Sequence, residues 1–158
     1  MKKFNLLLVL LLFLVTLNST FYFLFTIKVS VVDWIVLNPC AISNYVFLVG
    51  FIVYQIKGNK IIMYFAILPM TFFGGIGLII FPWDGIYNLI PQFSHILMTL
   101  AIIVTIYSTF KNNNFKEAFI GCIIGILLFS GFIAYQQRSV YQNPDKLNKI
   151  LGISLEKN

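Results

Sequence analysis

Five long apolar runs, separated by short polar connections, limit most strongly what this chain can fold into. A helix needs about 20 consecutive apolar residues to cross the hydrocarbon core of a bilayer. Helices suit that core because all their backbone hydrogen bonds close within one segment. The pattern therefore predicts an all-α fold, a polytopic membrane helical bundle with about five transmembrane helices. The expected spans are Phe4 to Ile27, Trp34 to Ile56, Ile61 to Phe81, Leu89 to Phe110 and Phe115 to Tyr135.

Composition indicates the same class of protein. Of the 158 residues, 59% are hydrophobic and only 10% are charged, a balance that soluble globular domains do not reach. Residues 1–158 are therefore predicted to form a single integral membrane domain, multi-pass in the cell membrane, with a polar tail over 136–158. Within that tail, Asn143-Pro144-Asp145 and the helical spacing of Leu147 and Ile150 predict a short interfacial helix.

The net charge of +6 comes from short basic clusters between the apolar runs. Lys and Arg that flank membrane spans tend to remain cytoplasmic. A cytoplasmic N-terminus satisfies this rule, because it places Lys57, Lys60, Lys111 and Lys116 on the inner side. The odd number of spans then places Arg138 outside, against the rule. Such clusters suit membrane lipids as partners, and because they form no basic stripe, we expect no nucleic-acid partner.

The two cysteines, Cys40 and Cys122, show no spacing typical of a disulfide framework or a zinc site. The chain has a single histidine, so we expect no bound metal and no cofactor. Cys122 lies between Gly121 and Gly125, a G-x-x-x-G pattern that favours helix packing. We interpret Cys122 as an inert packing residue.

Cys40 and His95 are the candidate catalytic residues. Each lies six residues into its predicted span, about 9 Å deep at the helical rise, and both spans run inward. The two side chains meet if the second and fourth spans are neighbours. A thiol beside an imidazole base is a nucleophile for acyl transfer. A histidine that only bridges two helices by a hydrogen bond is an equally good interpretation of His95.

Polar residues around the pair add candidates for substrate binding or oxyanion stabilisation. Gln92, His95 and Thr99 form one polar stripe, and Asn44 lies one turn after Cys40. Prolines directly before Cys40 and Gln92 weaken helical hydrogen bonding and could leave backbone N–H groups free nearby. The cluster Gly74-Gly75-Ile76-Gly77 favours close helix packing over substrate entry.

Three features between Trp34 and Tyr107 carry a resemblance. They are Leu37-Asn38-Pro39-Cys40, a glycine-containing span that ends at Phe81-Pro82, and Phe93-Ser94-His95 at the start of the next span. In their order and spacing, the chain resembles the YwaF-like family of bacterial integral membrane proteins, related to a eukaryotic transmembrane ether-phospholipid acyltransferase. The resemblance implies that Cys40 is the nucleophile and His95 the base, acting through a thioester. More distant androgen-dependent hydrolases use Thr as nucleophile, so the resemblance leaves transfer and hydrolysis both open.

Two functional hypotheses follow. The first is a membrane-embedded lipid acyltransferase or hydrolase with a Cys40/His95 dyad, assisted by Asn44, Gln92 or a backbone N–H. The second is a non-enzymatic small membrane protein that binds a lipid or hydrophobic ligand, or supports a partner membrane protein. A channel is disfavoured, because the spans carry almost no charge. The substrate and the oligomeric state do not follow from the sequence.

Overall fold

The computed structural model describes residues 2–80 and 83–142, and in these ranges the chain forms helices and no strand. The all-α prediction is therefore confirmed. The interfacial helix predicted after Asn143 lies outside the described residues. The elements in chain order are α1 (Lys2–Phe21), the π-helical turn η1 (Tyr22–Thr26), α2 (Val31–Leu37), α3 (Pro39–Lys57), α4 (Lys60–Ile80), α5 (Ile86–Asn112) and α6 (Phe115–Gln142).

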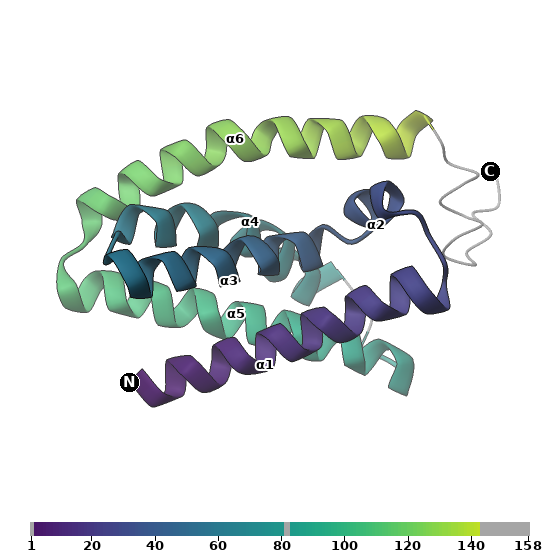
Figure 1. The fold of residues 1–158 in the computed structure, drawn as a ribbon, viewed down its shortest axis with the longest axis horizontal. Helices are drawn as coiled ribbons and strands as arrows, with labels where there is room; N and C mark the ends of the chain where they lie inside the picture. Colours follow the sequence, from purple (N-terminus) through teal and green to yellow (C-terminus); the bar gives the residue numbers. More distant parts are fainter. Residues whose placement is uncertain (1, 81–82, 143–158) are drawn as a thin grey trace.

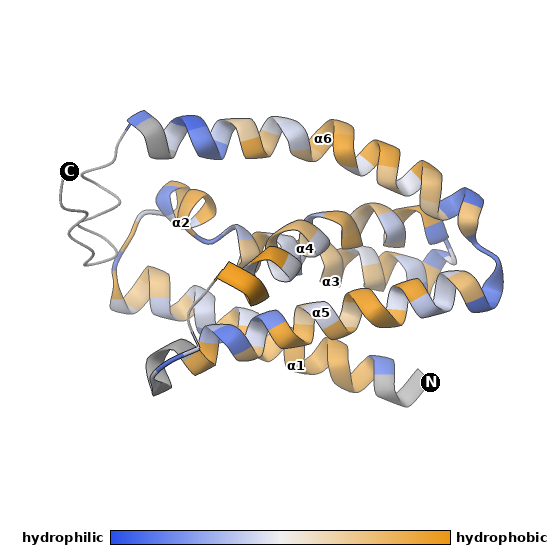
Figure 2. Cartoon of the chain, turned by 180° about the vertical axis from the view of Figure 1, so that it is seen from behind, coloured by the Kyte–Doolittle hydropathy of each residue, from blue (hydrophilic) through white to orange (hydrophobic). Residues whose placement is uncertain are grey.

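Five of these helical segments are long and apolar enough to cross a membrane. They correspond to α1 with η1, α3, α4, α5 and α6. Hydrophobic residues cover the middle of the helices, whereas hydrophilic ones gather at the ends and in the connections (Figure 2). Large apolar side chains such as Ile79 and Leu127 are exposed on the outer surface. Such a surface is unfavourable in water and suits lipid, so the protein is a membrane protein.

Helix α4 lies at the centre of the arrangement (Figure 1). It packs against α3, α5 and α6, while α1 packs against α3 and α5. The helices α1, α3, α4 and α5 thus form a ring in which α3 and α5 are diagonal, and α6 lies outside this ring on α4. The ring encloses a cluster of buried side chains: Leu8, Leu12, Phe47, Ile67, Met70, Leu97, Met98, Ala101 and Ile102.

Glycines allow the closest of these helix contacts. A β-carbon on Gly121 of α6 would lie 2.7 Å from the carbonyl oxygen of Ile61 and from Cβ of Tyr64, both in α4. One turn later, a β-carbon on Gly125 would lie 2.6 Å from Cδ2 of Leu68. The packing role predicted for the G-x-x-x-G pattern is therefore confirmed, and α6 is held on α4 by close backbone approach.

The second predicted span is not one continuous helix. The chain breaks at Asn38, which has φ −125° and ψ 59°, and this break separates α2 from α3. Pro39 explains it, since proline disfavours α-helical geometry in the preceding residue and has no N–H to continue a helix. Cys40 accordingly lies in the first turn of α3, and the prediction of six helical residues above it was wrong.

The first span agrees with the prediction to within one residue at each end, whereas the last helix is longer than predicted. The first α-helix ends at Phe21 and continues as the π-helical turn η1. Helix α6 continues to Gln142, so the first seven residues of the predicted polar tail are helical. Gln136 lies within α6, and its Nε2 donates a hydrogen bond to the carbonyl oxygen of Val36 in α2 at 2.9 Å. This contact holds the polar end of α6 against α2 and stabilises its helical conformation.

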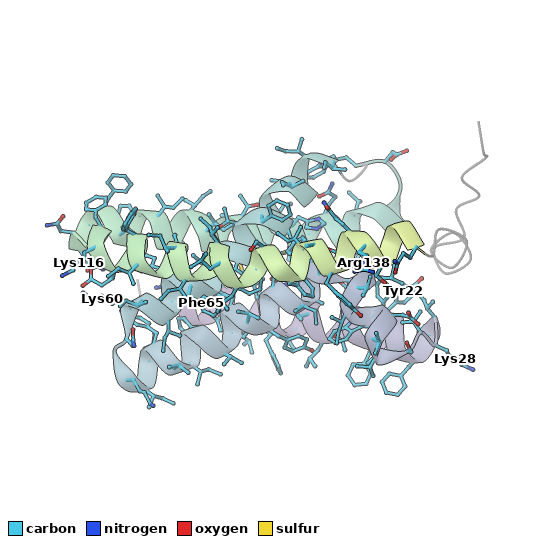
Figure 3. The ribbon with its side chains drawn as sticks, turned by 90° about the horizontal axis from the view of Figure 1, so that it is seen from above. Tyr22, Lys28, Lys60, Phe65, Lys116 and Arg138 are labelled. Carbon is cyan, nitrogen blue, oxygen red and sulfur yellow. The ribbon has the colours of Figure 1, made fainter. Side chains whose placement is uncertain are left out.

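The connections between α3 and α4 and between α5 and α6 lie at the same end of the bundle (Figure 1). We call this the lysine-rich end, defined by Lys57, Lys60, Lys111 and Lys116. Figure 3 shows Lys60 and Lys116 together at this end, and Lys28 and Arg138 at the opposite one. The grouping of lysines agrees with the connections that the positive-inside rule assigns to the cytoplasm.

Candidate functional site

Cys40 is held at the beginning of α3 by a well-formed helix start. The side chain of Asn38 accepts a hydrogen bond from the backbone N–H of Ala41 at 3.2 Å, and Pro39 occupies the first helical position. Proline is well suited there, because its fixed φ matches the helix and its missing N–H would have no partner. Ser43 Oγ donates to the carbonyl oxygen of Cys40 at 2.8 Å. The thiol therefore lies at a helix N-terminus, where the helix dipole favours negative charge.

Helix α1 ties this helix start into the bundle. Asn38 Nδ2 donates to Ser19 Oγ at 2.8 Å, and Asn44 Nδ2 donates to Thr16 Oγ1 at 3.0 Å. Thr16 is itself buried and donates to a carbonyl oxygen of its own helix. These contacts fix the first two turns of α3 against α1. The role of Thr16 and Ser19 was not predicted from the sequence. Their position as polar residues in an otherwise apolar span was the signal that they contact another helix.

The structure brings Cys40 and His95 into contact. Sγ of Cys40 lies 3.5 Å from Nε2 of His95, and 3.9 Å from the carbonyl oxygen of Phe73 in α4. The His95 side chain is only 3% exposed, whereas Cys40 is half-buried. At this separation the thiol and the imidazole can share one proton, with either atom as the donor. The arrangement has the geometry of a nucleophile beside a base.

The contact crosses the bundle from one diagonal helix to the other. The prediction required the second and fourth spans to be neighbours, yet α4 and α1 lie between α3 and α5 on the two sides of the ring. The side chains meet because both extend into the middle of the ring. Cys40 starts from the first turn of α3, and His95 lies in the buried face of α5, one turn before Met98.

Gly77 makes the room that His95 occupies. A β-carbon on Gly77 would lie 2.5 Å from Nε2 and 2.6 Å from Cδ2 of the imidazole ring. Gly74, one turn earlier in α4, makes similar room for Met98, whereas a β-carbon on Gly75 would meet nothing within 4 Å. The packing interpretation of this cluster is confirmed for Gly74 and Gly77. The specific role of Gly77 beside the imidazole was missed, because it depends on which helix faces α4.

The remaining predicted site residues differ in what their side chains do. Gln92 and Asn44 are each 1% exposed, and they lie one turn from His95 and Cys40 on the same helices. Asn44 Oδ1 has no hydrogen-bond partner among the described residues, although its Nδ2 is bonded to Thr16. Thr99 Oγ1 donates to the carbonyl oxygen of His95 at 2.8 Å, so this hydroxyl is bonded to its own helix. An oxyanion needs hydrogen-bond donors, and the amide donor of Asn44 is used by Thr16 while its oxygen can only accept. Gln92 is therefore the better side-chain candidate for stabilising negative charge near the dyad.

Other chemistry-bearing side chains lie apart from this site. Cys122 is a free, half-buried cysteine in α6, outside the ring of four helices. Across residues 2–80 and 83–142, no three or more His, Cys, Asp or Glu side chains are grouped so that they could hold a metal ion. Cys40 and His95 are thus the pair on which a functional assignment depends. Searches with protein-family models, against curated proteins and against solved structures returned no match to this chain.

Proposed function

We propose that the protein is a membrane-embedded, cysteine-dependent acyltransferase or hydrolase of lipids in the cell membrane. The single observation that supports this is the 3.5 Å contact between Sγ of Cys40 and Nε2 of His95. The dyad lies among membrane-spanning helices, which suits a substrate whose acyl chain lies in the bilayer. The resemblance of the sequence to the YwaF-like family agrees with the same assignment of roles.

The first half of the reaction forms a thioester. Sγ of Cys40 attacks the carbonyl carbon of an acyl ester and gives its proton to Nε2 of His95. The tetrahedral intermediate carries its negative charge on the former carbonyl oxygen. When it collapses, the carbon–oxygen bond to the leaving lipid breaks, and the proton on His95 passes to the leaving alkoxide. The products are a lysolipid and an acyl group bound to Cys40.

The second half of the reaction releases the acyl group. An acceptor hydroxyl of a lysolipid, or water, attacks the thioester carbonyl and gives its proton to His95. The carbon–sulfur bond then breaks, and the departing sulfur recovers the proton. A lysolipid acceptor makes the enzyme a transferase, whereas water makes it a hydrolase, so the access of water to this step decides between the two.

Charge on the intermediate needs hydrogen-bond donors close to the reacting carbon. The amide of Gln92 is a buried candidate one turn before His95. The backbone N–H of Cys40 is a second candidate, since the N–H groups of Ala41 and Ile42 already donate to Asn38. The amide of Asn44 already donates to Thr16, so we assign Asn44 mainly to holding α3 in place. Gln92 is the preferred side-chain donor because it lies on the same helix as His95, one turn before it.

An acylating probe with a detectable tag tests the proposal on purified full-length protein in lipid nanodiscs. Wild type is expected to be labelled through a hydroxylamine-sensitive thioester, and Cys40→Ala is expected to carry no label. Cys122→Ala is the matched control, because it removes the other cysteine and leaves the dyad intact; it should be labelled like wild type. His95→Gln should slow labelling by a factor of about 100 or more, since it removes the general base.

The outcome that overturns the proposal is equally direct. Full labelling or full lipid turnover by Cys40→Ala would show that the thiol is not the nucleophile. The Cys40 and His95 contact would then be a bridge between two helices, as in the non-enzymatic alternative. The hydrogen bonds that α3 donates to Thr16 and Ser19 agree with that alternative, because polar contacts of this kind stabilise helix packing without any chemistry.

A further inference from the structure

A cavity of about 100 Å³ opens at the lysine-rich end of the bundle, among α1, α3, α4 and α5. Along the helices, its wall begins at Phe47 and Ala101, about 9–10 Å beyond Cys40 and His95, and extends to Tyr54, about 21 Å beyond Cys40. The cavity is therefore separate from the dyad, and acyl transfer by Cys40 makes no use of it. Its volume is several times what one ordered water requires.

The wall of the cavity changes from apolar to polar along the helices. Towards the middle of the bundle it is formed by core residues, among them Leu8, Phe47 and Ala101. Towards the helix ends it is formed by polar side chains: Asn5, Tyr54, Gln55, Lys60, Ser108 and Asn114. A wall divided in this way matches an amphiphile whose head group lies at the helix ends and whose first chain carbons point inward.

Lys60 gives the polar part of the cavity a positive charge. It is the first residue of α4 and is half-buried, and its Nζ donates to Oδ1 of Asn114 at 2.7 Å. This oxygen belongs to a neutral amide, and the cavity wall contains no Asp or Glu. An ammonium group has three N–H donors, so two remain beyond the one given to Asn114. An ammonium group forms its strongest hydrogen bonds with charged acceptors such as a phosphate.

Asn5 adds an unpaired hydrogen-bond acceptor to the cavity wall. Its Oδ1 is buried and has no hydrogen-bond partner among the described residues. A buried acceptor without a donor is unfavourable, and a ligand hydroxyl would satisfy it. The same cavity therefore offers a cation for a phosphate and an acceptor for a hydroxyl, next to an apolar pocket for carbon chain.

We infer that this cavity binds the anionic, hydroxyl-bearing head group of a phospholipid from the leaflet next to the lysine-rich end. The phosphate lies against Nζ of Lys60, a head-group hydroxyl donates to Oδ1 of Asn5, and the first chain carbons lie against Leu8 and Phe47. The exposed lysines at the same end attract anionic lipids to this leaflet.

The test is equilibrium binding of dioctanoyl phosphatidylglycerol to the purified full-length protein in a non-ionic detergent. Lys60→Gln should weaken binding about tenfold, the effect expected from one lost charge-assisted hydrogen bond. Lys57→Gln is the matched control, since Lys57 is exposed three residues away and lies outside the cavity wall. It should bind within about twofold of wild type, because exposed charges contribute little.

A second variant keeps the test decisive if Lys60→Gln does not fold. Asn5→Leu removes the unpaired acceptor without changing any charge. It should weaken binding of dioctanoyl phosphatidylglycerol more than binding of dioctanoyl phosphatidate, whose phosphate carries no glycerol hydroxyls. Lys60→Arg, which keeps the charge, should retain binding.

Three results would overturn the inference. The first is that Lys60→Gln and Lys57→Gln bind dioctanoyl phosphatidylglycerol with the same affinity. The second is that wild type binds dioctanoyl phosphatidylcholine as tightly as dioctanoyl phosphatidylglycerol. The third is that wild type binds free glycerol 3-phosphate as tightly as dioctanoyl phosphatidylglycerol. The last result would assign the cavity to a soluble phosphate ester instead of a membrane lipid. None of these results depends on whether Cys40 can be acylated.

Discussion

At the scale of single residues, the position most sensitive to substitution beside the dyad is one without a side chain. A β-carbon at Gly77 would overlap the imidazole of His95, and the atom it would meet first, Nε2, is the one that contacts Cys40. Gly77→Ala should therefore displace the ring and separate the base from the thiol. Because misplacement by about 1 Å can cost a factor of about 100 in rate, we expect acyl labelling of Cys40 to slow by that order.

The control for this prediction lies two residues earlier in the same helix. A β-carbon at Gly75 would meet nothing within 4 Å, so Gly75→Ala adds the same methyl group to α4 without touching the dyad. It should be labelled at the wild-type rate. Equal labelling rates for the two variants would show that the position of the His95 ring does not limit the chemistry. Thermal unfolding of both proteins in detergent separates this effect from a loss of fold.

Asn38 is the residue that fixes where Cys40 begins its helix. Its side chain accepts from the N–H of Ala41 and donates to Ser19, so Asn38→Ala removes a helix cap and a bond between helices. We expect a loss of about 1–3 kcal/mol in the free energy of unfolding, measured by denaturant titration in mixed micelles. Asn38→Ser keeps an oxygen that can cap the helix, adds no charge and loses the amide donor, so it should fall between wild type and Asn38→Ala. A full loss in Asn38→Ser would mean that the cap contributes nothing.

At the scale of helices, α6 depends on one face. Its only extensive packing among the described elements is against α4, through Gly121 and Gly125. Gly121→Ala should push α6 away from the backbone of α4, because the added carbon would lie 2.7 Å from the carbonyl oxygen of Ile61. The expected cost is about 1–3 kcal/mol of unfolding free energy.

Gly131 offers the comparison within the same helix. A β-carbon there would meet nothing within 4 Å, so Gly131→Ala should be neutral, or stabilising by up to about 1 kcal/mol through its higher helix propensity. The two variants are compared by the same denaturant titration. If both are equally stable, α6 tolerates a wider separation from α4 than the structure indicates.

The existence of the helices could be predicted from the sequence, whereas the break before Cys40 could not. Hydropathy alone separates the five spans, because a span requires a long apolar run. The same signal hides the break at Asn38, since Trp34 to Leu37 is apolar as well and extends the run. The residue that indicates the break is Pro39, which we interpreted as weakening the helical hydrogen bonds within one continuous span. Proline at the first position of a helix is the better interpretation of Asn38-Pro39.

At the scale of the whole molecule, the contact between Cys40 and His95 was a prediction that the structure bears out, whereas its path across the bundle could not be predicted. Lysine positions and run lengths predict the direction of each span, and this direction led to the expectation that Cys40 and His95 lie at a similar depth. Which helices are neighbours depends on close packing, such as that of Gly77 on His95 and Gly121 on α4, and no periodicity in one helix shows its partner. The contact of diagonal helices therefore had to come from the structure.

The orientation of the whole bundle follows from its lysines and can be tested on intact cells. The lysine-rich end should face the cytoplasm, since Lys and Arg near span ends are retained there. With Cys40 and Cys122 both replaced by Ala, a single Asn112→Cys at this end should react with a membrane-impermeant maleimide only after lysis. Val32→Cys in α2, at the opposite end and exposed, should react in intact cells. The reverse pattern would place Cys40 near the cytoplasmic leaflet and move the proposed lipid site at Lys60 to the outer one.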